Sequence, residues 1–126
     1  MRPKWFMGYS DNTNLTFLLT TICDVASIYG PCAPTFGMEP WHLAIEDSEK
    51  LLRGEKLTVT GYERWERESK KDEEHPLMPY HVTEKRILKV FAKEEYVAIK
   101  GRLLGGCMDC LRNLIGTRYD YVAEFN

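Results

Sequence analysis

Residues 5–15 read WFMGYSDNTNL, and this stretch decides the expected fold. A short apolar run ends at a glycine, and polar residues at positions 10–14 separate it from a second apolar run at 15–23. This order is typical of a buried strand, a tight turn and the start of a helix, where Ser10 or Asp11 can cap the first turn. Because ligands of open α/β sheets bind at the carboxyl ends of strands, Ser10 and Asp11 are also candidates for substrate binding.

The same pattern follows once more along the chain. Residues 25–29 form a β-favouring run that ends at Gly30 and Pro31, and a helix is expected from about 41 to 53, with Gly54 placed to end it. This alternation of strand and helix predicts βαβ units, a parallel sheet and an α/β fold. Both sheet-end loops would then lie on one edge of the sheet, which makes Gly30 and Pro31 further binding candidates.

The loop at 32–41 carries two large aromatic side chains, Phe36 and Trp41. Surface loops often carry binding residues, and these rings could stack on a flat group or pack against an apolar side chain of a ligand. Alternatively, Trp41 opens the following helix and buries its ring in the core. Both residues are included among the binding candidates.

Three stretches of the chain together resemble one protein family. FMGYSDNTNL at 6–15, SIYGPCAPTFG at 27–37 and LLGGCMDCLRNLIGTRYD at 103–120 resemble the LD-carboxypeptidases and the microcin C self-immunity proteins, and the microcin-immunity-like branch most closely. These proteins are serine peptidases or amidases with a Rossmann-like N-terminal domain, a linker and a smaller C-terminal domain. The resemblance implies that residues 1–54 belong to the first domain, 55–84 to the linker or a hairpin, and 85–126 to the second domain.

The family uses a Ser-Glu-His triad, and the resemblance assigns none of its members to this chain. The serine precedes the segment that matches residues 4–11, and the glutamate and histidine follow the segment that matches 117–120. The chain's own histidines, His42, His75 and His81, lie at a predicted helix start or in a charged connector, and no Gly-x-Ser-x-Gly turn is present. We therefore expect an inactive middle fragment with no catalytic residue, metal ligand or cofactor. Its parent would cleave an amide bond next to a free carboxylate in a small peptide or aminoacyl-type substrate.

Gly105 and Gly106 follow a predicted strand at 95–104 and precede a predicted helix at 107–115. Two glycines at such a position let backbone N–H groups approach a ligand, or they allow close packing of the helix on the sheet. In the resembling family this element lines the cleft between the two domains. Gly105 and Gly106 are therefore candidates for holding a substrate carboxylate.

The remaining segments predict a solvated connector and more strands. Charges of both signs fill much of the connector at 55–84, in which 57–62 alternates as a strand would, and further strands are expected at 86–91 and 95–104. An incomplete sheet would expose strand edges and apolar faces. We therefore expect a homo-oligomer.

Composition narrows the class of protein. The 126 residues are 44% hydrophobic, which is enough for a sizeable core. A net charge of −2 gives no reason to expect nucleic acid or an anionic membrane as a partner. The sequence has no apolar run of membrane-spanning length and no signal peptide, so a cytoplasmic location is expected.

Four cysteines leave a different kind of function open. Cys107 and Cys110 form a C-x-x-C at a predicted helix start, as in redox motifs or half of a zinc site, but Cys23 and Cys32 do not supply the second half. The simpler alternative is that both thiols lie on the apolar face of the helix as small buried hydrophobes. A third possibility is a non-catalytic α/β module that binds a small carboxylated ligand or another protein.

Overall fold

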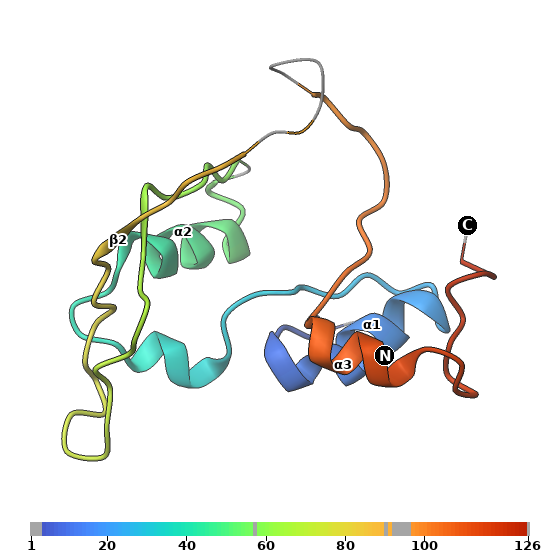
Figure 1. Cartoon of the computed structure of the whole chain (residues 1–126), viewed down its shortest axis with the longest axis horizontal. Helices are drawn as coiled ribbons and strands as arrows, with labels where there is room; N and C mark the ends of the chain where they lie inside the picture. Colours follow the sequence, from blue (N-terminus) through green and yellow to red (C-terminus); the bar gives the residue numbers. More distant parts are fainter. Residues whose placement is uncertain (1–3, 57, 90, 92–96, 126) are drawn as a thin grey trace. The chain divides into compact units, whose positions relative to one another are not determined.

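The computed structural model describes residues 4–56, 58–89, 91 and 97–125. Three α-helices, two 3₁₀ helices and a two-stranded antiparallel sheet are found in them (Figure 1). In chain order these are η1 (Ser10–Asn12), α1 (Thr13–Thr21), η2 (Ala33–Gly37), α2 (Leu43–Leu52), β1 (Arg64–Trp65), β2 (Glu84–Lys85) and α3 (Met108–Leu114). The described part is thus a mixture of helices with a small sheet.

The chain divides into two compact units. Unit 1 combines Met1–Ala33 with Arg102–Asn126, and unit 2 spans Pro34–Gly101. Unit 1 is therefore assembled from two distant parts of the sequence, whereas unit 2 is one continuous segment. The domain boundaries near residues 54 and 85 follow from the family resemblance and differ from the limits of these two units. They stay a prediction.

Unit 1 is built on α1, which packs against α3 (Figure 1). The buried side of α1 is formed by Phe17 and by three threonines, Thr13, Thr16 and Thr21. Thr16 and Thr21 bond to the carbonyls four residues earlier, at 3.2 and 3.0 Å. A threonine hydroxyl can enter a protein interior at low cost when a helix carbonyl accepts its hydrogen bond, so this polar face can be buried.

The strand expected before Gly8 and the strand expected at 25–29 meet in a single parallel bridge between Met7 and Ile28. Gly8 N–H donates to the Ile28 carbonyl at 3.1 Å, and Ile28 N–H donates to the Phe6 carbonyl at 3.0 Å. Parallel pairing in the described residues does not extend beyond this bridge. The direction of the pairing is the one expected, while a full parallel sheet stays a prediction.

Unit 2 contains α2 and the pair β1–β2, in which Arg64 lies opposite Lys85. Ile45 of α2 is buried, as is Met38. Gly54 has a φ of +74°, and its N–H donates to the Leu51 carbonyl at 3.0 Å. A left-handed glycine directly after a helix is a common helix terminator, so the predicted end of this helix is confirmed.

The strands predicted in the second half are wrong where the structure describes them. Residues 58–62, 86–89 and 97–104 are not in strands, and the sheet forms from 64–65 and 84–85 instead. Positions 57, 90 and 92–96 lie outside the described residues. β-propensity acts mainly through packing against neighbouring strands, and these runs lack such a neighbour in the described part: Phe91 is 95% exposed and Leu103 is 93% exposed.

Among the described helices, none is both long and apolar enough to cross a membrane.

Candidate functional site

The turn before α1 holds the first two candidate residues, Ser10 and Asp11. Ser10 has a φ of 56°, in the left-handed region that residues other than glycine rarely adopt. Its backbone N–H donates to the Tyr29 hydroxyl at 3.2 Å. This bond joins the turn to the residue just before Gly30, so the first two predicted loops meet here.

The prediction that Ser10 or Asp11 caps the helix is wrong. The N-cap residue of α1 is Asn12, which has helical backbone angles (φ −63°, ψ −12°) and makes no capping bond through its side chain. A capping side chain usually requires an extended backbone at the N-cap. Here the 3₁₀ turn η1 leads directly into α1, so the N-cap residue has helical angles instead. The Asn14 side chain instead donates to the Asp11 carbonyl at 3.0 Å.

The Gly105–Gly106 segment lies directly against the start of α1. The N–H of Cys107 donates to the Thr13 hydroxyl at 2.9 Å. A Cβ added to Gly106 would lie 2.4 Å from Thr13 Cγ2 and 3.0 Å from its hydroxyl oxygen, whereas one added to Gly105 would meet nothing within 4 Å. Gly106 is thus required by close packing on the buried Thr13 of α1, whereas the predicted packing was of a helix on a sheet.

The backbone amides of Gly105 and Gly106 are available for the other predicted role. Among the described residues, no acceptor takes a hydrogen bond from either N–H. Gly105 is exposed and Gly106 is partly exposed. Two neighbouring amides without side chains can approach an anionic group such as a carboxylate.

Gly30 and Pro31 lie in the second loop of the same unit. A Cβ on Gly30 would lie 3.1 Å from the Met7 sulfur, so this glycine allows the loop to pass close to the parallel bridge. Pro31 is partly buried. The side-chain amide of Asn12 donates to the Cys32 sulfur at 3.3 Å, which gives a second link between the two loops.

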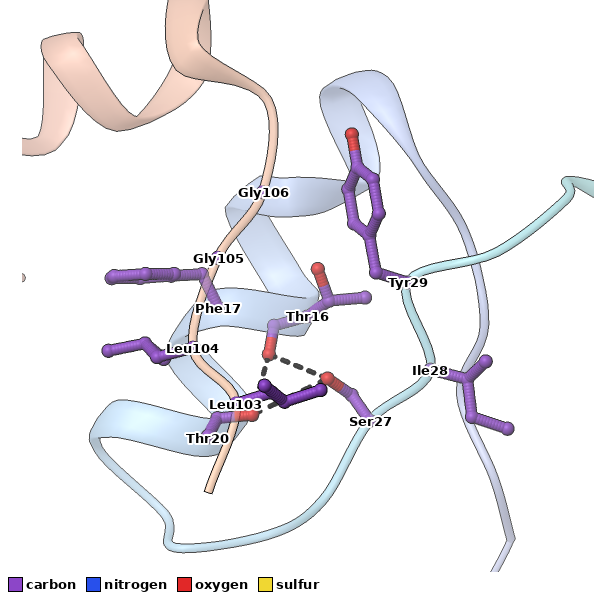
Figure 2. Close-up of a pocket in the computed structure, with 10 residues that line it drawn as sticks. All are labelled: Thr16, Phe17, Thr20, Ser27, Ile28, Tyr29, Leu103, Leu104, Gly105 and Gly106. Atoms are coloured by element: carbon purple, nitrogen blue, oxygen red, sulfur yellow. Dashed lines mark hydrogen bonds between the residues drawn. The ribbon is translucent and has the colours of Figure 1, made fainter. Parts of the chain in front are cut away.

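A cavity of about 420 Å³ lies beside α1 within unit 1 (Figure 2). Its lining residues are uncharged and comprise hydroxyl-bearing, aromatic, aliphatic and glycine residues, namely Thr16, Phe17, Thr20, Ser27, Ile28, Tyr29, Leu103, Leu104, Gly105 and Gly106. The Ser27 hydroxyl donates to the Thr16 carbonyl at 2.8 Å, and the Thr20 hydroxyl to the same carbonyl at 3.2 Å. The cavity can therefore hold an uncharged group, with Gly105 and Gly106 among its lining residues.

The other two candidates, Phe36 and Trp41, belong to unit 2. Their rings contact each other edge to face, with centroids 6.0 Å apart, and the Trp41 Nε1–H donates to the Phe36 carbonyl at 2.9 Å. The alternative in which Trp41 opens the helix and buries its ring is wrong, because α2 starts at Leu43 and Trp41 is 40% exposed. The indole bonds the loop to itself, and its binding role stays a prediction.

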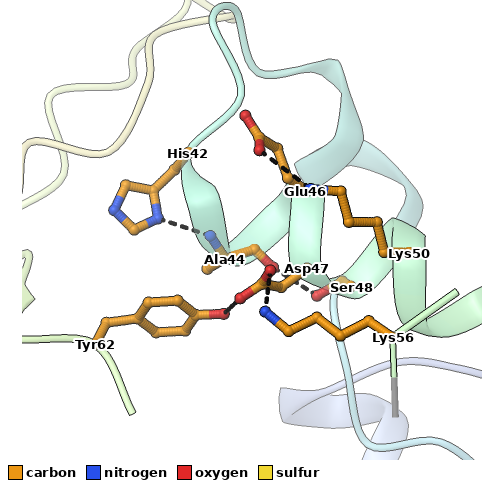
Figure 3. Close-up of polar contacts among 8 residues, drawn as sticks. All are labelled: His42, Ala44, Glu46, Asp47, Ser48, Lys50, Lys56 and Tyr62. Carbon is orange, nitrogen blue, oxygen red and sulfur yellow. Dashed lines mark hydrogen bonds and ion pairs between the residues drawn. The ribbon is translucent and has the colours of Figure 1, made fainter. Parts of the chain in front are cut away.

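Sequence reasoning missed a polar cluster in unit 2, centred on Asp47 of α2 (Figure 3). Asp47 is 3% exposed, and its carboxylate accepts hydrogen bonds from Lys56 at 2.6 Å and from the Tyr62 hydroxyl at 2.8 Å. The Lys56 bond and then the Tyr62 bond hold the pKa of Asp47 below its usual value. Burial, followed by the bond to Asp47, raises the pKa of Tyr62 to about 12. Nothing in the sequence marks Asp47, because its partners come from outside the helix.

His42 also belongs to this part of unit 2. It is the N-cap of α2, and its Nδ1 accepts a hydrogen bond from the Ala44 N–H at 3.1 Å. Its ring lies edge-on to Tyr62 and Tyr80, with centroids 5.9 and 5.6 Å away. His42 thus has a structural part in starting the helix, consistent with its predicted position.

No metal-binding cluster of His, Cys, Asp and Glu is found among the described residues. His75 bonds to Asp72 at 3.0 Å, and both side chains are exposed. The four cysteines, all in the described part, are free, and Cys107 and Cys110 are only partly buried. Fully buried thiols, the simpler expectation for this pair, are therefore not observed.

No family model, curated protein or solved structure matches this chain. The geometry nevertheless groups the candidates clearly. Six belong to unit 1, where they come from three separate stretches of sequence: Ser10, Asp11, Gly30, Pro31, Gly105 and Gly106.

Proposed function

We propose that this chain is part of a cytosolic serine carboxypeptidase or amidase of the LD-carboxypeptidase family, close to its microcin-immunity-like branch. In this proposal the parent protein cleaves an amide bond next to a free carboxylate, and unit 1 belongs to its Rossmann-like parallel-sheet domain. The chain binds substrate, and the Ser-Glu-His triad lies elsewhere in the parent. The order of three family-like stretches supports the assignment, as does the parallel bridge between Met7 and Ile28.

The observation that carries the proposal is the contact between the turn at 10–13 and the segment at 105–107. The family-like stretches that contain these segments are far apart in the sequence, yet Cys107 N–H bonds to Thr13 at 2.9 Å. The sulfur of Cys110 lies 3.7 Å from the Ser10 carbonyl and 3.9 Å from the Asp11 carboxylate. Residues from distant stretches of the sequence therefore lie next to one another on one surface of unit 1.

The chemistry of this surface suits one end of a peptide. The unbonded amides of Gly105 and Gly106 can donate to the two oxygens of a terminal carboxylate. The adjoining cavity, which has the hydroxyl-bearing residues Ser27 and Tyr29 in its lining, can hold the uncharged part next to that carboxylate. Hydroxyls can both donate and accept, so they suit the amide groups of a substrate.

Peptide binding by the isolated chain tests this assignment directly. We would titrate an LD-tetrapeptide with a free carboxyl end, and the same peptide with a C-terminal amide, into isotopically labelled protein and follow the backbone amide signals. The free acid should shift the signals of Gly105 and Gly106 more than the amide does. Equal shifts with both peptides, or no shifts, would contradict the carboxylate site.

Hydrolysis by the chain alone should be absent with the tetrapeptide and with an aminoacyl sulfamoyl adenosine. Turnover that disappears on Ser10→Ala would refute the proposal, because it would place a nucleophile in this chain. The second candidate function, a non-catalytic small-ligand module, is favoured by the 420 Å³ cavity. It predicts the same binding without any larger hydrolase encoded around this segment.

Homo-oligomer formation is part of the same proposal. Several large apolar side chains are exposed in the described residues, among them Ile87, Phe91 and Ile99. Large apolar side chains left exposed to water can favour association with another protein surface. Sedimentation should show concentration-dependent self-association that weakens in Phe91→Lys and is unaffected by the exposed Glu68→Lys.

A further inference from the structure

The C-x-x-C of α3 lies at the contact between α3 and the turn before α1. Cys107 is the N-cap of α3, with an extended backbone (φ −68°, ψ 124°), and Cys110 is the third helical residue. The Cys107 thiol is among the groups that interact with Cys110, so the two thiols are neighbours at the first turn of α3.

Cys110 makes several contacts with the turn. Its sulfur donates to the Ser10 carbonyl, with the two atoms 3.7 Å apart, and lies 3.9 Å from the Asp11 carboxylate. The side-chain amide of Asn14 donates to the same sulfur at 3.8 Å. The thiol proton of Cys110 thus takes part in holding α3 against residues 10–14.

The protonated form of Cys110 is favoured at this place. Burial raises the pKa of its thiol, and the neighbouring Cys107 thiol and Asp11 carboxylate raise it further. Both cysteines are nevertheless partly exposed, so small oxidants can reach them. Attack on a sulfenic acid uses a thiolate, so Cys110 must lose its proton before it can act as the resolving thiol.

We propose that Cys107 and Cys110 form a reversible disulfide under peroxide, and that this disulfide weakens the contact between α3 and the turn at 10–14. The proposal does not depend on the peptidase assignment. Its ligand class is a small peroxide, and its site is the first turn of α3.

The chemistry balances with a peroxide as oxidant. The Cys107 thiol loses its proton and attacks a peroxide oxygen, which gives a sulfenic acid and one water. Cys110 then attacks the sulfenic sulfur, so that the S–S bond forms, the S–O bond breaks and a second water leaves. Two thiols are oxidised and one peroxide is reduced. The product has no S–H at Cys110, so the donor to Ser10 is lost.

The test uses the full chain with hydrogen peroxide, followed by alkylation of the remaining thiols and trypsin digestion. Cleavage after Arg102 and Arg112 gives a single peptide, 103–112, that contains both cysteines. We expect this peptide to be unalkylated and lighter by two hydrogens, and dithiothreitol should restore the alkylatable form. Diamide, which oxidises thiols and spares Met108, should give the same product.

Control variants separate this pair from the other thiols. Cys23→Ser removes an exposed cysteine and should leave the 103–112 product unchanged. Cys107→Ser and Cys110→Ser should each leave one alkylatable thiol in this peptide under diamide. A disulfide to Cys32, a disulfide between two chains, or sulfinic acid without a disulfide would overturn the assignment.

Hydrogen exchange tests the coupling to the turn. Oxidised wild-type protein should exchange the amides of residues 10–14 several-fold faster than reduced protein, and dithiothreitol should reverse the change. The amides of α2 in unit 2 should exchange at unchanged rates. Formation of the disulfide without faster exchange at 10–14 would show that the bond forms but does not act on the turn, which contradicts the second half of the proposal.

Discussion

The backbone N–H of Cys107 donates a hydrogen bond to the side chain of Thr13, although the two residues are 94 positions apart. Thr13 is 1% exposed, so this bond replaces water for a hydroxyl in the interior of unit 1. The bond fixes the approach of the Gly105–Gly106 segment to α1. The packing around it gives the first prediction.

Gly106→Ala should destabilise the protein by about 1–3 kcal/mol, because the new methyl group would overpack Thr13. Its Cβ would lie 2.4 Å from Thr13 Cγ2. Gly105→Ala is the matched control, since its Cβ would meet nothing within 4 Å. Thr13→Ser removes only Cγ2, so combining it with Gly106→Ala should recover part of the lost stability. Urea unfolding measures the three single variants and this double variant against wild type. Equal midpoints for the two glycine variants would contradict the packing.

Asp47→Asn should lower the pKa of Tyr62 from about 12 towards its usual 10.0, because a hydrogen-bond acceptor of full negative charge is removed. Ultraviolet absorbance during alkaline titration follows tyrosine ionisation. Subtracting the curve of Tyr62→Phe isolates this residue from the other tyrosines. Burial also contributes to the raised pKa, so only part of the difference should disappear. An unchanged curve would show that the contact is not formed in solution.

Stability should fall in acid through Asp47. Its pKa is lowered in the folded state, so its contribution is present above the unfolded value of 3.8 and is lost as the pH falls through the folded pKa. Urea unfolding at a series of acidic pH values should show a steeper loss for wild type than for Asp47→Asn. Glu68→Gln, at an exposed carboxylate, is the control and should keep the wild-type slope. Parallel curves for wild type and Asp47→Asn would rule out this linkage.

Gly54→Ala should destabilise unit 2 by about 1 kcal/mol, because alanine is strained at a φ of +74°. The space around the position is open, so the effect comes from the backbone alone. Gly101→Ala also enters open space, but the φ of Gly101 is not in the left-handed region, so the substitution should be close to neutral. Thermal unfolding of the two variants checks the difference, which should vanish if residue 54 can leave the left-handed region freely.

Phe36→Ala should lower stability by about 1 kcal/mol through loss of the edge-to-face contact with Trp41. In the proposed parent enzyme, the same change should raise KM more than it lowers kcat if the ring also holds substrate. Kinetics identical to wild type, together with a lower melting temperature, would assign the pair to structure alone.

Local signals in the sequence predicted the helices well. The apolar run at 15–23, the stretch before Gly54 and the residues after Gly106 correspond to α1, α2 and α3. Helix formation depends on contacts three or four residues apart, so the sequence pattern carries most of the information. The predicted cap was wrong because the 3₁₀ turn η1 precedes α1. The Ser10 N–H in this turn bonds to the distant Tyr29 hydroxyl, and a local sequence pattern does not contain that contact.

Features that need distant partners were predicted less well. The short sheet pairs Arg64 with Lys85, and neither residue lies in a predicted strand. The environment of Asp47 depends on Lys56 and Tyr62 meeting the same face of α2. Register and meeting points of this kind are set by tertiary packing, which local propensity does not encode. The expectation that sheet-end loops lie on one edge predicted that the loops at 10–11 and 30–31 would be close to each other. It did not predict the contact of residues 105–107 with Thr13.

The assembly of unit 1 from two ends of the sequence sets an order of events during translation. Unit 2 is continuous and can fold as soon as residue 101 has left the ribosome. The hydrogen bond from Cys107 to Thr13 can form only after residue 107 has been synthesised. Closing a loop of this length also slows the packing of α1 against α3. A premature stop codon before Gly105 would therefore leave unit 2 able to fold while the threonine face of α1 remained open to chaperones and proteases.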